Sequence, residues 1–311
     1  MIPPTAKRLT LKSGLTLPHS IFPGPMEGVM NPLFCKAAEE LNLTDFWITP
    51  FLRITTGPVS KKKIKHFILP FSQHRKPVIL QLMGTSPALM IETAHRAEKL
   101  GIAGVNFNLA CPSKQVTGGG CGGALLKNHT FIKELMLLSE NLPKEFSVSL
   151  KIRTGLQSPD ELPVIAASIK SGRTPDFVVI HYRTVEEGYR KVDGRIERLK
   201  KAVKLFKEIP VIGNGDIQSA EDAEKVIADT DCQGVMVARG WLKNLNLIRD
   251  ILKGKESSVK DKDIIFSKFV KIMAENISHD NRKKTRNSII ELTRYAYGIT
   301  HPLFLKIINK I

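Results

Sequence analysis

Eight short apolar runs recur along the first 240 residues of this 311-residue chain, and the segments between them have helical periodicity. The runs are rich in Val, Ile and Phe, which favour strands, whereas apolar residues in the intervening segments return every three or four positions. Successive runs begin roughly 25 to 40 residues apart, which is the length of one strand and one crossover helix. We predict strands at residues 20–26, 46–51, 77–83, 104–111, 146–152, 177–183, 209–216 and 234–240.

Polar or reactive side chains stand at the ends of nearly all these predicted strands. They are Met26, Glu27, Gln81, Asn108, Cys111, Lys151, His181, Arg183, Asn214, Asp216 and Arg239. In a closed barrel of eight parallel strands these ends meet at one face, where sites of that fold are built. A doubly wound sheet would place a ligand at a single switch point. The pattern therefore favours an α/β fold, a (β/α)8 TIM barrel.

The pattern changes after the last barrel helix. Residues 254–262 are polar and charged and resemble a linker, and the remaining chain has helical periodicity without a β pattern. From residue 253 to 311 there are 13 Lys and Arg against 6 Asp and Glu. We predict a catalytic barrel at residues 1–253 and a small all-α, basic domain at residues 258–311.

The whole chain is strongly basic, with 47 Lys and Arg against 30 Asp and Glu and a net charge of +17. Such an excess suits nucleic acid or an anionic membrane surface, although a basic proteome would also produce it. Four irregularly spaced cysteines argue against a disulfide framework and against a metal site. No segment resembles a signal peptide or a membrane span, so we expect a cytoplasmic protein with no membrane contact.

Two strand ends suit a phosphate, and two others suit a flat cofactor. Residues 213–217 (GNGDI) and 238–240 (ARG) offer backbone N–H groups where barrels often hold a phosphate, although both could be plain tight turns. The Gln81 amide and the Lys151 ammonium suit the polar edge of a flavin ring. Lys151 could equally form a Schiff base, and His181 could be a structural histidine.

Cys111 directly follows a predicted strand and precedes a glycine-rich loop. Buried cysteines are usually inert, but a thiol at the active face of a barrel beside a flexible loop suits chemistry. Cys121 lies within that loop, where we expect a surface thiol without a role.

The motifs at these strand ends closely resemble those of the tRNA-dihydrouridine synthases. They are PMEGV (25–29), QLMG (81–84), NLACPS (108–113), KIR (151–153), HYRT (181–184), GNGDI (213–217) and ARG (238–240). The resemblance runs from about residue 20 to residue 243 and covers every strand end except the second. PMEGV and the segment RTVEEGYR (183–190) are most similar to the bacterial C-type branch.

The resemblance implies an FMN-dependent TIM barrel followed by a helical RNA-recognition domain, with tRNA as the substrate and NADPH as the reductant. It makes Cys111 the general acid and implies no metal. It places FMN against Pro25, Met26, Glu27, Gln81, Lys151, His181, Asn214, Gly215, Asp216, Ala238 and Arg239. Asn108, Arg153 and Arg183 would lie near the uracil or the neighbouring phosphates.

The implied reaction adds hydride to C6 of a uridine and a proton to C5. A thiol with the ordinary pKa of about 8.5 is mostly protonated at neutral pH and can donate that proton. The base has to leave its stack to enter the barrel, and a basic surface has to supply the binding free energy. Candidate phosphate contacts are the basic segments 61–66, 190–204 and 282–286, each of which could also be a solvated face.

Alternatives to this interpretation remain open at this stage. The same chemistry could act on ribosomal RNA, a flavin barrel could reduce a small molecule, or the chain could be a non-catalytic RNA chaperone. Three residues depart from the usual family pattern, Asn31, Ala110 and Tyr182, of which Tyr182 could reshape the pocket. We expect a monomer, and the sequence does not identify the target uridine.

Overall fold

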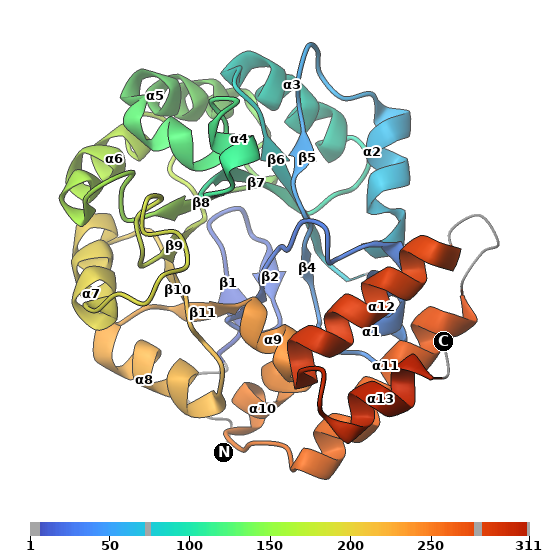
Figure 1. The fold of residues 1–311 in the computed structure, drawn as a ribbon. Helices are drawn as coiled ribbons and strands as arrows, with labels where there is room; N and C mark the ends of the chain where they lie inside the picture. The colour runs from blue at the N-terminus through green and yellow to red at the C-terminus, as the bar shows by residue number, and fades with distance from the viewer. Residues whose placement is uncertain (1–6, 72–75, 277–281, 310–311) are drawn as a thin grey trace.

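The computed structural model describes residues 7–71, 76–276 and 282–309. A parallel sheet curls into a nearly closed barrel with helices around its outside (Figure 1). The hydrogen-bonded order is β3-β11-β10-β9-β8-β7-β6-β4, with β5 also paired to β6. The strands are β3 (Ile21–Pro23), β4 (Trp47–Ile48), β5 (Leu52–Arg53), β6 (Val78–Met83), β7 (Gly104–Leu109), β8 (Ser147–Arg153), β9 (Phe177–His181), β10 (Val211–Asn214) and β11 (Gly234–Val237). The predicted TIM barrel is confirmed.

The second predicted strand, residues 46–51, is broken into two short pieces. β4 pairs with the start of β6 and β5 pairs with its end. Pro50 stands between them, and proline has no N–H to donate to a ladder.

Helices follow the strands and cover the outside of the barrel. They are α1 (Pro32–Glu40), α2 (Lys61–Ile68), α3 (Pro87–Glu98), α4 (Lys114–Thr117), α5 (His129–Leu138), α6 (Leu162–Ile169), α7 (Arg195–Phe206), α8 (Ala220–Thr230), α9 (Arg239–Lys243) and α10 (Leu247–Lys253). Short 3-10 turns lie at η2 (Leu69–Phe71), η3 (Gly122–Lys127), η4 (Ser139–Asn141) and η5 (Pro159–Glu161). Side-chain oxygens of Ser86, Asn128 and Ser219 accept backbone N–H groups at the starts of α3, α5 and α8, which fixes where these helices begin.

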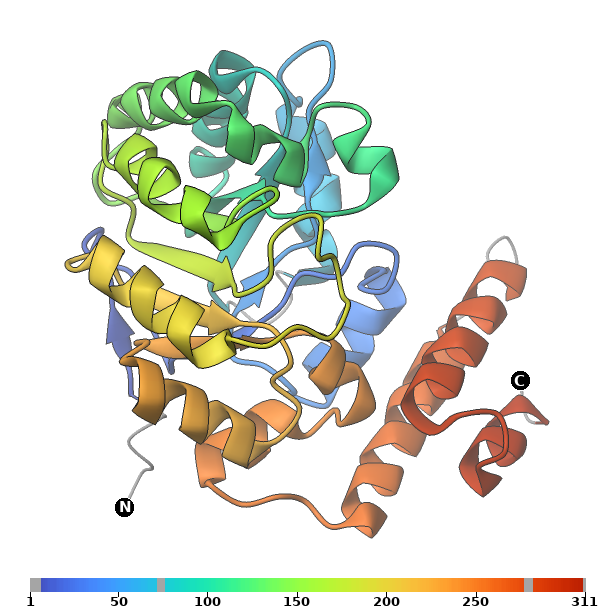
Figure 2. The same ribbon diagram turned by 60° about the vertical axis from the view of Figure 1, so that its left-hand side comes forward.

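A small antiparallel hairpin closes the end of the barrel opposite the strand ends that carry polar groups. It consists of β1 (Leu9–Thr10) and β2 (Thr16–Leu17), and it lies at one side of the barrel in Figure 2. Leu17 is fully buried and belongs to the core cluster inside the barrel, which includes Phe22, Phe177 and Met236. This hairpin was not predicted from the sequence because two-residue strands show no alternation.

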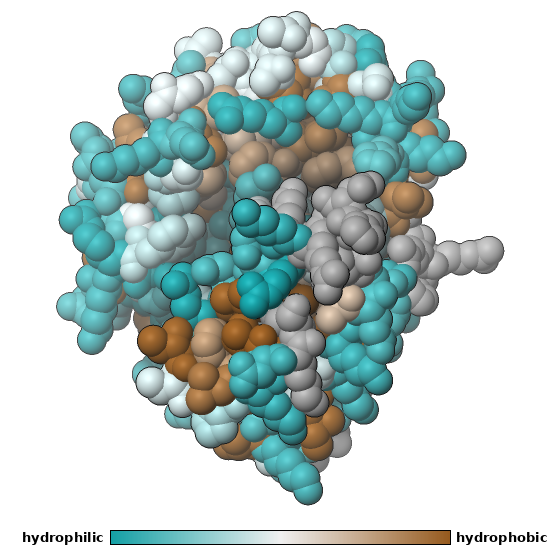
Figure 3. All heavy atoms as spheres, turned by 45° about the vertical axis from the view of Figure 1, so that its right-hand side comes forward, coloured by the Kyte–Doolittle hydropathy of each residue, from teal (hydrophilic) through white to brown (hydrophobic). Residues whose placement is uncertain are grey.

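Three further helices follow the barrel, α11 (Val259–Glu275), α12 (Arg282–Tyr297) and α13 (Pro302–Ile308), and Figure 2 shows them as a separate layer. α11 packs on α1, where the rings of Phe34 and Phe269 meet with centroids 5.0 Å apart. The face that carries these helices is largely hydrophilic, with hydrophobic side chains gathered in its lower part (Figure 3). Within the described ranges, no helix combines the length and apolar character needed to cross a membrane.

Candidate active site

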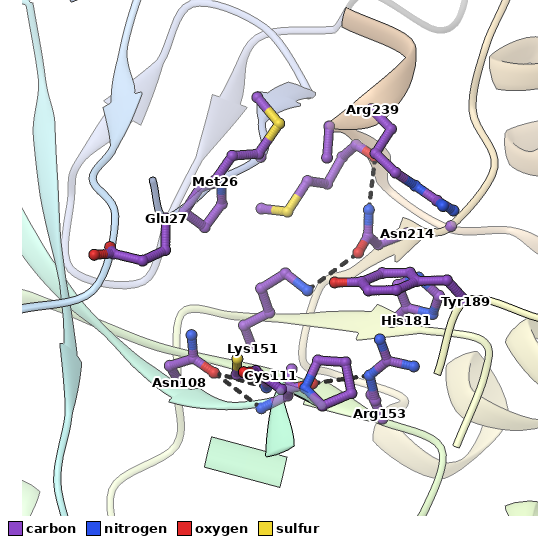
Figure 4. A pocket seen from close by; sticks show the side chains of 18 of the residues that line it. Met26, Glu27, Asn108, Cys111, Lys151, Arg153, His181, Tyr189, Asn214 and Arg239 are labelled. Carbon is purple, nitrogen blue, oxygen red and sulfur yellow. Dashed lines mark hydrogen bonds between the residues drawn. The ribbon is translucent and has the colours of Figure 1, made fainter. Parts of the chain in front are cut away.

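A cavity of about 1170 Å³ opens at the carboxyl ends of the barrel strands, and Figure 4 shows side chains pointing into it. All candidate site residues line it, namely Pro25, Met26, Glu27, Gln81, Asn108, Cys111, Lys151, Arg153, His181, Arg183, Asn214, Gly215, Asp216, Ala238 and Arg239. Their convergence follows from their shared place at strand ends. Their contacts show what each side chain can do.

A chain of amide hydrogen bonds crosses three neighbouring strands beneath the cavity. The Asn108 amide donates to Gln81 Oε1 at 2.8 Å, and the Gln81 amide donates to Asn106 Oδ1 at 2.9 Å. Asn106 in turn donates to the Ser149 hydroxyl at 2.9 Å, which donates to the carbonyl of Val105 at 3.1 Å. All these side chains are buried except for a small fraction of Asn108. The network therefore fixes the orientation of each amide group.

Backbone hydrogen bonds hold Cys111 in place, and its side chain lines the cavity. Asn108 Oδ1 accepts the N–H groups of Ala110 at 3.0 Å and of Cys111 at 3.1 Å. The carbonyl of Cys111 accepts the N–H of Gly123 at 3.0 Å. A Cβ at Gly123 would lie 2.6 Å from a methyl group of Val185, so only glycine lets this loop close on Cys111.

Cys121 does not lie on the surface, and our expectation for it was wrong. Its side chain is 4% exposed and packs with Met83 and Val116, a cluster that Cys111 also contacts. The backbone N–H of Cys121 donates to the carbonyl of Val116, which turns the loop inward.

The Lys151 ammonium lies inside the cavity, where it donates to Asn214 Oδ1 at 3.1 Å (Figure 4). The Asn214 amide donates to the carbonyl of Met236 at 2.9 Å, which fixes the orientation of its acceptor. Burial, with a smaller contribution from the charge of Arg153, lowers the pKa of Lys151 to about 7. The lysine therefore titrates near neutral pH.

His181 at the end of β9 is buried and uncharged. Burial and the positive charge of Arg153 and Lys151 lower its pKa well below the usual value. Its Nδ1 accepts the backbone N–H of Arg183 at 3.2 Å, so the neutral ring carries its proton on Nε2. One nitrogen thus has a structural partner, and the imidazole also lines the cavity.

Asp216 gathers three donors at the end of β10. The Tyr182 hydroxyl and Arg183 donate to Oδ2 at 2.8 and 2.5 Å, and Arg239 donates to Oδ1 at 3.0 Å. Burial raises the pKa of Asp216, but the hydrogen bonds from Arg183 and Tyr182 outweigh it and the pKa is lowered overall. The backbone here is left-handed, with φ of 116° at Gly215 and 53° at Asp216.

Arg153 donates to the protein's own carbonyl groups. Its guanidinium donates to Ala110 at 2.8 Å, to Thr184 at 2.8 Å and to Gly188 at 2.9 Å. Burial lowers the pKa of Arg153 to about 10, so the group stays charged at neutral pH. It therefore joins the loop that carries Cys111 to the loop after β9.

Arg183 is also buried, with 2% of its surface exposed. Its guanidinium donates to the carbonyl of Arg190 and to Asp216. Its Nη1 is buried and has no acceptor among the described residues. A buried guanidinium nitrogen in this state is suited to an anion that enters the cavity.

Several residues around the cavity were missed by the sequence analysis. Asn106 was signalled by being polar within an apolar strand. Tyr189 is 58% exposed and lies between Arg153 and Arg239, whose guanidinium carbons are 5.5 and 4.6 Å from its ring centre. Lys243 and Tyr295 reach the rim from α9 and α12, and no local pattern places them there.

The predicted basic segments differ in their relation to the cavity. The Lys side chains at 61–63 and 65 are exposed, and Lys63 reaches the cavity. Lys191 and Arg195 of the second segment also line it. In the third segment, the side chains of residues 282 and 284 lie outside the described residues. In the part of the chain that the structure describes, no three His, Cys, Asp or Glu side chains cluster as a metal site would require.

Comparisons with known proteins agree with this architecture. The family model for dihydrouridine synthases matches residues 22–304 of the chain. A tRNA-dihydrouridine(16) synthase of Haemophilus influenzae is 34% identical over 230 residues, which cover 72% of this chain and 73% of that protein. A tRNA-dihydrouridine(16) synthase of Vibrio parahaemolyticus is 31% identical over 296 residues, covering 91% of this chain and 90% of that protein.

A solved structure of morphinone reductase in complex with tetrahydroNAD is similar in fold. Its TM-score is 0.58 at 15% identity, and the match covers 86% of this chain and 94% of that one. At this identity the likeness concerns the barrel fold alone. The family model and the relatives, by contrast, match the sequence over most of its length. The chain therefore belongs to the dihydrouridine synthase family and is a flavin-dependent oxidoreductase.

Proposed function

We propose that this chain is an FMN-dependent tRNA-dihydrouridine synthase, which uses NADPH to reduce the C5–C6 double bond of uridine 16 in tRNA. The substrate and the position come from the names of its relatives. The observation that carries the proposal is that Cys111 and Lys151 face one cavity at the strand ends of a barrel from this family.

The residues of the cavity fit a flavin mononucleotide. A volume of about 1170 Å³ exceeds the usual size of a single small-molecule site, so it has room for a cofactor and a base together. Gln81, Lys151 and Asn214 offer oriented polar groups for the ring edge. Arg239 and the Nη1 of Arg183, which has no acceptor among the described residues, offer positive charge for a phosphate. A bound flavin supplies the hydride that C6 of the uracil accepts.

Cys111 holds the proton that C5 then requires. Asn108 fixes the backbone on which the thiol stands, and Arg153 ties the preceding residue to the loop after β9. Hydride addition leaves negative charge on the uracil ring, and nearby cations stabilise that charge. Because Lys151 titrates near pH 7, it can hold a proton beside the ring when this anion forms.

One base of the RNA has to leave its stack to enter the cavity, and this unstacking costs a few kcal/mol. The exposed lysines of α2, with Lys63 at the cavity, provide phosphate contacts on one side of its mouth. We propose that residues 258–311 form the second, RNA-recognising unit, since α12 brings Tyr295 to the rim. The monomeric state and the cytoplasmic location stay predictions.

The test is to incubate purified protein and NADPH with bulk tRNA, ribosomal RNA or free uridine, and to measure dihydrouridine by mass spectrometry. We expect product in tRNA alone, located at position 16. Product only in ribosomal RNA, or only from free uridine, would contradict the proposal.

The variant Cys111→Ala tests the proton donor, and Cys232→Ala is its control because Cys232 is buried away from the cavity. We expect Cys111→Ala to keep flavin and RNA but to lose about 100-fold or more in turnover. Undiminished turnover would remove Cys111 from the mechanism.

A further inference from the structure

A second cavity, of about 560 Å³, lies between the barrel and the C-terminal helices. Its wall combines the loop after β3 with α1, α9, α11 and α12, and it includes Val29, Leu242, Met273 and Leu292. Met26, Arg239 and Tyr295 line this cavity and the active-site cavity alike. The two cavities therefore adjoin each other.

The wall of the second cavity is mostly apolar, and some of its side chains are tightly packed. Phe34 contributes to it and is held edge-on against Phe269 at 5.0 Å and Trp241 at 5.8 Å. Tyr295 is 41% exposed and presents its ring at the boundary. Asn287 and Glu291 stand at the exposed rim. Such a slot suits a flat heteroaromatic ring that has polar groups at its edge.

The boundary between the cavities is cationic. Arg239 forms part of it, and Lys243 Nζ lies 5.9 Å from the centre of the Tyr295 ring. Positive charge between two ring-sized sites matches the phosphate that joins two nucleotides. The second cavity shares three wall residues with the active site, so it lies beside the position that an adjacent nucleotide would occupy.

We propose that the second cavity binds the nucleobase adjacent to the target uridine and so contributes to the choice of that uridine. The inference rests on the proposed function, because it assumes an RNA substrate. Stacking a base on one aromatic side chain changes binding by about tenfold or more. The second cavity is thus a specificity site built jointly by the barrel and by α12.

The experiment measures kcat/KM for dihydrouridine formation by the flavin-loaded enzyme on three tRNAs. One is unmodified, one lacks the base of nucleotide 15, and one lacks the base of nucleotide 17. The enzymes are wild type, Tyr295→Ala and the control Leu137→Ala, which changes an exposed side chain on α5 that lines neither cavity. We expect one of the two abasic tRNAs to lose about tenfold in kcat/KM with wild type.

The decisive result is how the two changes combine. Tyr295→Ala should lose about tenfold on unmodified tRNA but should use the sensitive abasic tRNA no worse than wild type does. Leu137→Ala should follow wild type on all three. If Tyr295→Ala retains little folded protein, Asn287→Trp serves instead, because it obstructs the slot from an exposed position. Like Tyr295→Ala, Asn287→Trp should use the sensitive abasic tRNA no worse than wild type does.

Equal rates on all three tRNAs with wild type, or losses that multiply, would overturn the proposal. So would weakened flavin binding in Tyr295→Ala without a changed response to the abasic tRNAs, since the cavity would then belong to the cofactor. Failure of the proposed function looks different, because wild type would then form no dihydrouridine in unmodified tRNA.

Discussion

Replacement of Lys151 by methionine should stabilise the flavin-free protein while it removes flavin binding. The lysine ammonium is placed in the cavity wall, away from most water, and its pKa falls from 10.5 to about 7. A buried charge of this kind lowers the stability of the folded state. Methionine has a similar length and no charge, so it removes that cost.

The magnitude follows from the shift of the pKa. A fall from 10.5 to about 7 corresponds to about 5 kcal/mol, at 1.36 kcal/mol per pH unit. Water that enters the cavity reduces this cost, and the variant also loses the hydrogen bond to Asn214, which is worth about 1 kcal/mol. We therefore expect flavin-free Lys151→Met to be about 2 to 3 kcal/mol more stable than wild type near pH 6.

The difference should depend on pH with a definite sign. Below pH 7 the lysine is charged in both the folded and the unfolded chain, so the full cost is present. Between pH 7 and pH 10.5 the folded chain has lost the proton and the unfolded chain keeps it, so wild type gains stability as pH rises. The advantage of the variant should therefore shrink across this window.

Urea unfolding of flavin-free protein near pH 6 and near pH 9.5 measures both effects. Lys204→Met, at an exposed position of α7, is the matched control and should change stability by less than about 0.5 kcal/mol. A Lys151→Met variant that is no more stable near pH 6, or whose advantage stays constant with pH, would contradict this prediction.

Three further substitutions test other parts of the structure. Arg153→Lys cannot bond three carbonyl groups at once, so we expect a loss of about 2 to 4 kcal/mol in urea unfolding and faster hydrogen exchange in residues 184–188. Tyr182→Phe removes the hydroxyl that donates to Asp216 and should cost about 1 kcal/mol in the same assay, whereas an unchanged midpoint would show that this bond contributes nothing. Leu17→Ala empties a fully buried position under the barrel and should cost about 2 to 5 kcal/mol, compared with less than about 0.5 kcal/mol for the exposed control Lys12→Ala.

The barrel could be predicted because the barrel strands are mostly buried and apolar, and nearly every predicted strand has a polar or reactive residue at or near its end. Where strands end was harder to predict. The run at 104–111 leaves the ladder after Leu109, because the next two N–H groups bond to Asn108 instead. The run at 234–240 ends at Val237, where α9 begins two residues later. Local side-chain hydrogen bonds and a new helix set these limits, and neither leaves a periodic pattern.

The strand-end residues of the site could be predicted, but those supplied by loops and by α12 could not. Lys151 and Asn214 were expected to share one face because both stand at strand ends, and both line the cavity. Tyr189 lies in the loop after β9, and a hydrogen bond from Arg153 to the carbonyl of Gly188 holds that loop in position. Tyr295 reaches its place because α11 packs on α1 through Phe269, a contact between segments far apart in sequence.

The charges of the cavity indicate the kind of ligand it needs. Lys151, Arg183 and Arg239 bring positive charge to its wall, and hydrogen bonds from Arg183 and Tyr182 lower the pKa of Asp216. Partial burial raises the pKa of Glu27 above its usual value. The excess of positive charge, with an Arg183 nitrogen that has no acceptor in the described part of the chain, lowers the stability of the ligand-free protein. An anionic ligand relieves that cost, and a flavin phosphate together with a uracil ring that becomes negative during reduction supplies charge of the required sign.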